Sequence, residues 1–590
     1  MTSREKQIWI ALLVLAIFLR VAVHSQLAHY VLYRVPLVDA EEYVGWAAML
    51  AQGGAEPADV YYKAPLYPRI LAFAMRLFGP TPGTATLLNA ALGVLNVLLF
   101  GVWVRRFAGA RIAMWTSACA AVYGPFLYFE AQALPTTLGV TWVLGSLLAL
   151  SVRQGEPRSR HLLLAGLCMG LAVVTRPSFL LWVPLASVWV GLGQGRAARR
   201  WGAMLLVAAA AMLAILPVTL RNRAQGGEWV LVSANGGINF YLGNNAAAER
   251  TSILRPGLEW ENLVRNVPPQ ERRGQARWDR HFARRAWTWV REEPAAFVAG
   301  LGRKTLHYFD SHEIDRNLDV RGFRAQSSVL RWAPRYACLA PWLFLGVVVA
   351  WRRGRVARLA LLFWASVFAA TVLIFVTERY KVDATAATLP LTLLGVRESV
   401  AHLRRRTTTV SAWLAALLIA AGAVLAYANL TRIRGLHPAH AAILEGVALY
   451  KEGQFAEAIT RLQSGLARHP QDADGHYQLA TALQKQNRLS EALRAYEAAA
   501  ALVPGNPKPH MGVGWILKEQ GRLEAALERY ERALHVDPHN ALVAFETATL
   551  LERLGRSEEA RRLYARVVGL SQDPGLGAEA ARREQRLRDR

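Results

Sequence analysis

Three acidic residues stand close together after the first apolar run of the chain: Asp39, Glu41 and Glu42, in the stretch VDAEEY. A lysine follows among aromatic residues and prolines, Lys63 in YYKAPLYP. A carboxylate can accept a proton from a hydroxyl group, and an ammonium group can neutralise a phosphate. Charged residues beside a hydrophobic segment are costly to hold near a membrane, so these residues are candidates for a functional site. The alternative interpretation is a polar loop between two membrane helices.

The composition indicates a membrane protein. Of the 590 residues, 53% are hydrophobic and 19 are tryptophan, and the apolar residues gather in long runs. The formal charge is +26, which could indicate nucleic acid, anionic lipid or phosphate partners. The arginines, however, form short clusters between apolar runs, as the positive-inside rule requires of membrane proteins. We therefore expect a membrane partner and no nucleic acid.

The apolar runs determine how many helices can cross a membrane. A crossing helix needs about 20 mainly apolar residues, and about eleven segments come close to that requirement. These segments are residues 8–24, 84–104, 109–127, 133–152, 161–175, 177–194, 201–220, 331–351, 358–376, 383–400 and 409–429. We interpret the first as an uncleaved span, because Arg20 interrupts it and no clear small-x-small cleavage site follows.

Arginine clusters fall on every second connection between these segments, as at residues 105–106 and 404–406. Short loops rich in arginine stay in the cytoplasm, so the amino terminus is predicted to be inside. The alternate connections are then outside: residues 25–83, 128–132, 221–330, 377–382 and 430–590. The sequence therefore predicts an integral protein of the inner (cytoplasmic) membrane whose C-terminal part lies on the outer, periplasmic side.

Two outer stretches, residues 41–52 and 64–78, are amphipathic and too short or too polar to cross, so we expect helices along the outer interface. The long outer segment 221–330 contains GGEWVLVSANGGINFYLGNN, whose glycine pairs and asparagines predict turns and short extended pieces. A basic helix is predicted within residues 271–294. We expect its tryptophans to face lipid: Trp278, Trp287 and Trp289.

From about residue 440 the sequence repeats with a period of 34 residues. The same turn is marked in each unit by Gly453, Asn487, Gly521 and Gly555. A helix–turn–helix unit of this length, with alanine and proline at fixed places, resembles the tetratricopeptide repeat. We expect four repeats over residues 440–575, a charged tail over 576–590, and a protein or peptide partner on the repeats.

Three short motifs occur in order on the outer side of the predicted membrane half: VDAEEY, YYKAPLYP, and ERYK at residues 378–381. With these motifs, residues 8–400 resemble the GT-C-fold glycosyltransferases, specifically glycosyltransferase family 39. That family includes protein O-mannosyltransferases and bacterial aminoarabinose–lipid A transferases. The resemblance implies an all-α fold, with a polytopic membrane domain over residues 1–430 followed by the tetratricopeptide α-solenoid. No HExxH, GxSxG or Walker motif competes with it.

Enzymes of this family transfer a sugar from a polyprenyl-phosphate carrier to an acceptor. The resemblance implies that Asp39 is the catalytic base, and an attacking hydroxyl needs one. Lys63 matches a lysine that contacts the carrier phosphate, although this chain has Ala-Pro where Pro-Pro often stands. Arg379 of ERYK is predicted at a second outer position, where an arginine would clamp the same phosphate, on which negative charge builds as the bond breaks.

Further substrate-binding candidates surround these residues. Glu42 shares a face with Asp39 if a helix begins here, and it would hold the acceptor or a divalent cation; a helix-surface charge is the alternative. Glu130 resembles an acid found in relatives that would contact acceptor or sugar, with a simple helix-end acid as the alternative. Tyr380, next to Arg379, completes the set. No metal ligands are predicted, because the histidines are scattered.

The predicted function is therefore a membrane glycosyltransferase. It would move a sugar from a polyprenyl-phosphate carrier to an acceptor protein, lipid or glycan on the outer face of the membrane. The alternative is a non-catalytic, membrane-anchored tetratricopeptide scaffold for envelope assembly. A transporter is a third interpretation, but it would need acids at the membrane middle, whereas these acids lie at its outer edge. Glu313 in SHEIDRN is a weaker additional candidate.

Overall fold

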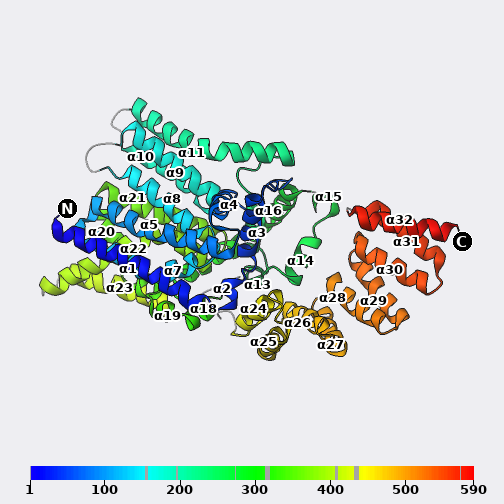
Figure 1. Ribbon diagram of the computed structural model, residues 1–590. Helices are drawn as coiled ribbons and strands as arrows, with labels where there is room; N and C mark the ends of the chain where they lie inside the picture. The colour runs from blue at the N-terminus through cyan, green and yellow to red at the C-terminus, as the bar shows by residue number, and fades with distance from the viewer. Residues whose placement is uncertain are drawn as a thin grey trace. The chain divides into compact units, whose positions relative to one another are not determined.

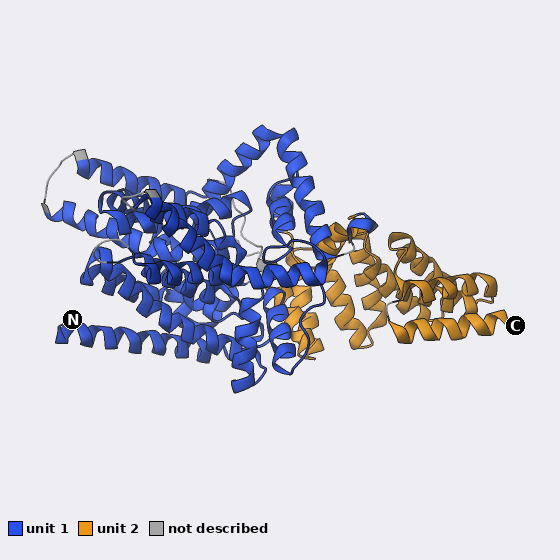
Figure 2. Cartoon of the chain, turned by 90° about the horizontal axis from the view of Figure 1, so that it is seen from above, with its two compact units in different colours: residues 1–253, 268–436 blue, residues 254–267, 437–590 orange. Residues whose placement is uncertain are grey.

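The computed structural model describes residues 2–152, 157–193, 197–272, 274–312, 319–405, 410–430, 438–571 and 573–589. The chain forms two compact units. Residues 1–253 and 268–436 make up the first, called here the N-terminal unit, and residues 254–267 and 437–590 make up the second, called here the repeat unit (Figure 2). The described residues of both units form helices joined by turns and loops (Figure 1).

Helices form most of the described length of the apolar segments in the N-terminal unit. They are α1 (Ser3–Leu27), α5 (Pro82–Ala108), α6 (Ala110–Val122), α7 (Gly124–Glu130), α8 (Thr136–Leu150), α9 (Ser159–Thr175), η1 (Pro177–Phe179), α10 (Trp182–Leu192), α11 (Ala197–Gly226), α19 (Ser328–Trp332), η2 (Tyr336–Cys338), α20 (Ala340–Arg352), α21 (Arg355–Leu373), α22 (Glu378–Arg405) and α23 (Val410–Tyr427).

Within the described residues, 4 helices are long and apolar enough to cross a membrane: α1, α5, α11 and α21. The number rises to 6 if each of two pairs bent by 51°, α6–α7 and α19–α20 with η2, is one span. The bend between α6 and α7 precedes Pro125, which lacks an N–H for helical hydrogen bonding. The helices α8, α9, α10 and α23 are apolar but shorter, so about eleven crossings stay a prediction.

Small residues bring two of these helices into close contact. A Cβ atom at Gly166 would lie 2.3 Å from the carbonyl oxygen of Val207, and one at Gly170 would lie 2.3 Å from that of Ala211. The two glycines are four residues apart and therefore share one face of α9. This small-xxx-small pattern packs α9 against α11 and is typical of helix pairs in membranes.

The remaining helices of the N-terminal unit have 4 to 18 residues. They are α2 (Val31–Arg34), α3 (Asp39–Ala51), α4 (Leu66–Phe78), α12 (Gly236–Gly243), α13 (Ala248–Thr251), α15 (Pro269–Arg272), α16 (Gln275–Glu292), α17 (Pro294–Phe309) and α18 (Val320–Gln326). The helices predicted at residues 41–52 and 64–78 correspond to α3 and α4, and the basic helix corresponds to α16.

Two expectations for the outer segment are wrong. The run INFYL lies in the helix α12 and not in an extended piece, because Asp279 accepts a hydrogen bond from the N–H of Ile238 and α12 packs on α16. Trp278 does not face lipid. It is buried within the protein, with its ring against Phe282 and Tyr62 at centroid distances of 5.3 and 5.8 Å. Tertiary packing thus overrides the local pattern in both places.

The described residues from 438 onward in the repeat unit form four helix pairs and a final helix. These are α24 (Pro438–Lys451), α25 (Phe455–Arg468), α26 (Ala473–Lys485), α27 (Leu489–Leu502), α28 (Pro507–Glu519), α29 (Leu523–Val536), α30 (Ala541–Arg553), α31 (Ser557–Leu570) and α32 (Pro574–Arg588). The unit also includes α14 (Leu258–Arg265), which is far away in sequence.

The repeating turn residues have the backbone conformation that their types suggest. Gly453, Asn487, Gly521 and Gly555 have φ values of 81°, 57°, 74° and 77°. Glycine and asparagine tolerate this left-handed conformation, which ends the first helix of each pair. The charged tail forms α32, whose Ala580 and Leu587 are buried in the core of the repeats, so it is a capping helix.

Candidate functional site

Asp39 begins α3 directly after a strained residue. Val38 has φ of 55°, which is unfavourable for a β-branched side chain and costs on the order of 1–3 kcal/mol. Asp39, Glu41 and Glu42 occupy the first turn of α3, where the helix dipole favours negative charge. The strained backbone conformation of Val38 therefore lies directly before Asp39, the first candidate carboxylate.

Four predicted site residues form one cluster of ion pairs. They are Asp39, Glu42, Lys63 and Arg379, and they come from three segments of the chain. Lys63 Nζ lies 2.7 Å from Asp39 Oδ1 and 2.6 Å from Glu42 Oε2. Arg379 Nη1, at the start of α22, lies 2.7 Å from Asp39 Oδ2. Each oxygen of the Asp39 carboxylate thus faces a different cation.

The site is partly open to solvent. The side chain of Asp39 is 25% exposed, and that of Lys63 is 11% exposed. Glu42, which also contacts Lys63, is 59% exposed. Solvent therefore reaches the shared carboxylate, and the lysine is the most enclosed of these groups.

The charges determine the protonation of the cluster. Burial alone would raise the pKa of Asp39, but the charges of Lys63 and Arg379 and their hydrogen bonds hold it well below its usual range. Burial alone would lower the pKa of Lys63, but Asp39, Tyr43 and Glu42 raise it. The pKa of Arg379 is raised against its burial, chiefly by Asp39. At neutral pH, Asp39 is a carboxylate between two cations.

Aromatic rings lie next to these cations. Lys63 Nζ is 5.2 Å from the centre of the Tyr43 ring. Tyr380 lies beneath two guanidinium groups, those of Arg176 at 5.6 Å and Arg379 at 6.0 Å from its ring centre. Cation–π contacts of this kind hold a flexible arginine in one orientation.

Sequence reasoning missed the ion pair between Arg176 and Asp383. Arg176 Nη1 lies 2.9 Å from Asp383 Oδ1, with the two side chains 4% and 0% exposed. Two signals could have identified it. Arg176 stands alone between the segments 161–175 and 177–194, and Asp383 is an acid at the start of a predicted span. Ionisable residues in such positions are functional candidates by default.

Glu130 is held by a different partner. Its Oε2 lies 2.9 Å from Nε of Arg20, and both side chains are only 3% exposed. Arg20 also donates to the carbonyl oxygen of Ala121 and so ties α1 to α6. The structure therefore places Glu130 in a buried ion pair, away from the ionic contacts of Asp39. Glu313 lies outside the described residues.

A pocket of about 510 Å³ opens beside the cluster. Glu42 and Lys63 contribute to its wall. The other lining residues are Trp46, Met49, Pro57, Ala58, Asp59, Val60, Tyr61, Tyr62 and Gln275. Charged groups at one side of a largely apolar and aromatic cavity are typical of small-molecule sites.

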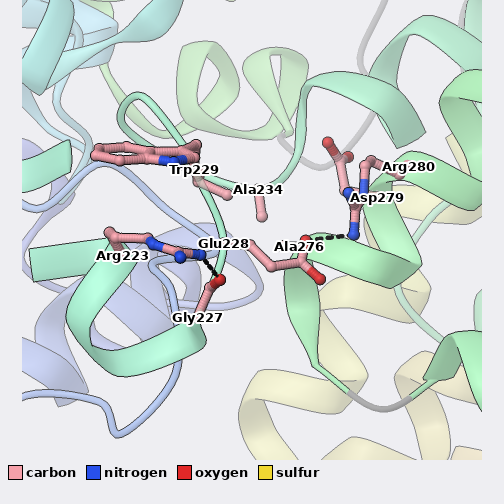
Figure 3. A pocket seen from close by; sticks show the side chains of 9 residues that line it. Arg223, Gly227, Glu228, Trp229, Ala234, Ala276, Asp279 and Arg280 are labelled. Carbon is pink, nitrogen blue, oxygen red and sulfur yellow. Dashed lines mark hydrogen bonds and ion pairs between the residues drawn. The ribbon is translucent and has the colours of Figure 1, made fainter. Parts of the chain in front are cut away.

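A second pocket, of about 470 Å³, has α16 as one wall (Figure 3). Arg223 lies over the exposed ring of Trp229, at 5.5 Å from its centre. Glu228 pairs with Arg280 of α16 at 2.5 Å. Because Gln275 lines the first pocket and Ala276 the second, α16 borders both cavities.

Within the described part of the chain, no group of three or more histidine, cysteine, aspartate or glutamate side chains is arranged to hold a metal ion. Of the two acids in the wall of the first pocket, Glu42 faces Lys63, and Asp59 accepts hydrogen bonds from the backbone N–H groups of Val60 and Gln275. A divalent cation at Glu42 therefore stays a sequence-based prediction.

Comparison with known proteins identifies the repeats. Residues 449–516 and 514–575 match family models of the tetratricopeptide repeat, so the chain carries tetratricopeptide repeats at its C-terminal end. No curated protein sequence matches the chain.

Several solved structures are similar to a part of the chain. A crystal structure of MamA is 14% identical, with a TM-score of 0.23, and the match covers 26% of this chain and 86% of that one. YrrB, described as having an unusual peptide-binding site, is 20% identical, with a TM-score of 0.23 and coverages of 32% and 87%. PilF of Pseudomonas aeruginosa is 18% identical, with a TM-score of 0.24 and coverages of 32% and 84%.

Proposed function

We propose that the N-terminal unit is a membrane glycosyltransferase that moves a sugar from a polyprenyl-phosphate carrier to an acceptor protein, lipid or glycan on the outer face of the membrane. The observation that carries this proposal is the Asp39 carboxylate, shared between Lys63 and Arg379. One base and two cations, of which Lys63 lies in the wall of a pocket, are the groups that such a transfer needs.

In the proposed reaction, the acceptor hydroxyl oxygen attacks the anomeric carbon of the sugar. The bond between that carbon and the phosphate oxygen breaks, and its electron pair leaves with the phosphate. The proton of the hydroxyl moves to Asp39. Lys63 and Arg379 bind the phosphate and stabilise the negative charge that builds on it, so no strong general acid is needed.

The two ion pairs of Asp39 explain how binding and basicity are linked. A carboxylate held by two cations is a weak base, because both cations favour its charged form. When the carrier phosphate draws Lys63 and Arg379 toward itself, Asp39 loses their stabilisation and its pKa rises. The base would therefore become active when the donor substrate is in place.

The neighbouring residues fit supporting roles. Arg176, fixed by Asp383, packs on Tyr380 and so helps to orient Arg379. Glu42 reaches the pocket wall beside Lys63, where it is placed to hold the acceptor. The ion pair of Glu130 with Arg20 favours a structural role for Glu130, between α7 and α1.

The test uses the purified full chain with labelled polyprenyl-phosphate sugars and membranes as the acceptor source. Asp39→Asn keeps the size of the side chain and removes its basicity, so transfer should fall about 10²-fold or more. Glu41→Gln, at an exposed position of the same helical turn, is the matched control and should keep its turnover. Near-normal transfer by Asp39→Asn would refute the assignment.

The second candidate function is a membrane-anchored tetratricopeptide scaffold for envelope assembly. The family matches over residues 449–575 favour it, because stacked repeats present extended surfaces for proteins or peptides. We place these repeats on the periplasmic side, as the arginine pattern predicts. A wild-type chain that binds its partner but labels no acceptor would support the scaffold alone.

A further inference from the structure

Residues 254–267 lie in the long outer segment of the sequence but belong to the repeat unit in the structure (Figure 2). This stretch, called here the docked segment, contains α14. It contacts the ends of repeat helices and the loops between them, from His440 to Asp537. The repeats therefore already hold a peptide, and it is part of the same chain.

Leu258 is the apolar anchor of the docked segment. Its side chain is 2% exposed and forms a small core of its own with residues of one repeat, the α26–α27 pair. These residues are Ala473, Tyr477, Ala499 and Val503. A single leucine enclosed in this way is typical of the anchor residue of a bound peptide.

The repeats also hold the backbone of Leu258 on both sides. Its N–H donates to Asp474 Oδ1 at 2.7 Å, and its carbonyl oxygen accepts from Asn506 Nδ2 at 3.1 Å. Asp474 and Asn506 come from the starts of two successive first helices. A pair of side chains that bonds both groups of one residue recognises the peptide backbone as well as the leucine.

Charged contacts fix the direction of the docked segment. Glu261 Oε1 lies 2.5 Å from Lys508 Nζ, and Arg265 lies 3.9 Å from Asp537. Arg255, at the other end, lies 4.0 Å from Asp472. The recognised pattern is an arginine, then a leucine, then an acid three residues later, then a second arginine.

The docked segment fills this site tightly. A Cβ atom at Gly257 would lie 2.3 Å from Asp474 Oδ2. A second peptide cannot make the same contacts while the segment stays in place, because Asp474, Asn506 and Lys508 are all engaged by it.

We propose that the docked segment is a tethered ligand, and that the external partner of the repeats is a peptide of the same pattern that displaces it. The proposal rests on the peptide-binding role of the repeats and not on sugar transfer. A tethered ligand competes at an effective concentration of about 1 mM. For an intrinsic Kd of about 100 μM, it would weaken binding of a free copy about 10-fold.

The test measures fluorescence anisotropy of a labelled peptide with the sequence of residues 254–267, added to the purified full chain in detergent. Leu258→Asp in the chain should release the docked segment and tighten binding of the peptide about 10-fold relative to wild type, and Glu261→Lys, which removes one contact of the segment, should tighten it about 5-fold. Glu259→Lys makes the same charge change at an exposed position and should bind the peptide as the wild type does.

A second arm tests the site itself. In the Leu258→Asp background, Lys508→Glu should weaken the peptide about 10-fold, and a peptide carrying Glu261→Lys should restore binding. Equal affinity of the wild type and both released variants, or no binding to either released variant, would overturn the proposal. The Asp39→Asn substitution should leave every one of these affinities unchanged, so failure of the proposed transferase is seen separately.

Discussion

Asp39→Asn should separate carrier binding from turnover. In the wild type, the carrier phosphate must compete with Asp39 for Lys63 and Arg379, each held at 2.7 Å. In the variant, no carboxylate stands between these two cations. We therefore expect the variant to bind polyprenyl phosphate more tightly than the wild type while its turnover collapses.

The size of the effect follows from the two ion pairs. Exposed pairs contribute about 0.2–1 kcal/mol each, and more enclosed charged hydrogen bonds contribute about 1.5–3 kcal/mol. With side chains 11–28% exposed, about 1 kcal/mol for each pair is a middle value. Asparagine keeps about half of this total through neutral hydrogen bonds, so about 1 kcal/mol is released, which is about a 5-fold gain in affinity.

The assay is equilibrium binding of a labelled polyprenyl phosphate to the purified chain in detergent. Lys63→Ala and Arg379→Ala are the opposing variants, since each removes a phosphate ligand and should weaken binding about 10-fold, the loss of one charge-assisted hydrogen bond. Weaker binding by Asp39→Asn would refute the competition between carboxylate and phosphate. Unchanged binding by both alanine variants would refute the phosphate clamp.

Two further predictions concern packing and pH. Gly166→Ala should lower the free energy of unfolding by about 1–3 kcal/mol, because its Cβ would meet the carbonyl oxygen of Val207. Gly202→Ala is the control: a Cβ there would have nothing within 4 Å, so this variant should be neutral or stabilising by up to about 1 kcal/mol. Thermal unfolding in detergent compares the two variants. Burial raises the pKa of Asp474 to about 6, so the folded repeats bind its proton more tightly than the unfolded chain does. Their stability should therefore decline as pH rises from about 4 to about 6 and stay level above that range, and Asp474→Asn, which keeps an acceptor for Leu258, should flatten the decline. An unchanged pH slope in this variant would contradict the role of Asp474.

The repeats could be predicted from the sequence because their signal is local. Gly453 and its equivalents need a left-handed conformation, and each turn lies within one helix pair. The docked segment could not be predicted in this way. Leu258 is one leucine in a polar stretch, and its burial depends on residues more than two hundred positions away. Nothing in a local pattern indicates such a contact.

The candidate site could be predicted from the sequence in part: its residues could be identified, but their contacts could not. Asp39, Lys63 and Arg379 each stood out by residue type and by sidedness, but only the fold shows that one carboxylate is shared by both cations. Glu130 and Arg20 also stood out separately, as an acid at a helix end and a charge within a span. Their pairing depends on how α1 packs against its neighbours, which the apolar pattern of either helix leaves open.

Two adjacent residues at the proposed site, Val38 and Asp39, contribute little or unfavourably to stability. This observation supports a functional role for them rather than a purely structural one. An ion cluster adds little stability by itself, because hydrophobic residues of similar volume often replace one without loss. Val38, next to Asp39, has a backbone conformation that a β-branched residue avoids. If stability alone had been selected, we would expect hydrophobic residues in place of the ion cluster and, at position 38, a residue that tolerates a positive φ. The coincidence of the ion cluster and the strained residue beside a pocket lined by Glu42 and Lys63 is what is expected where a carboxylate must be held ready for chemistry.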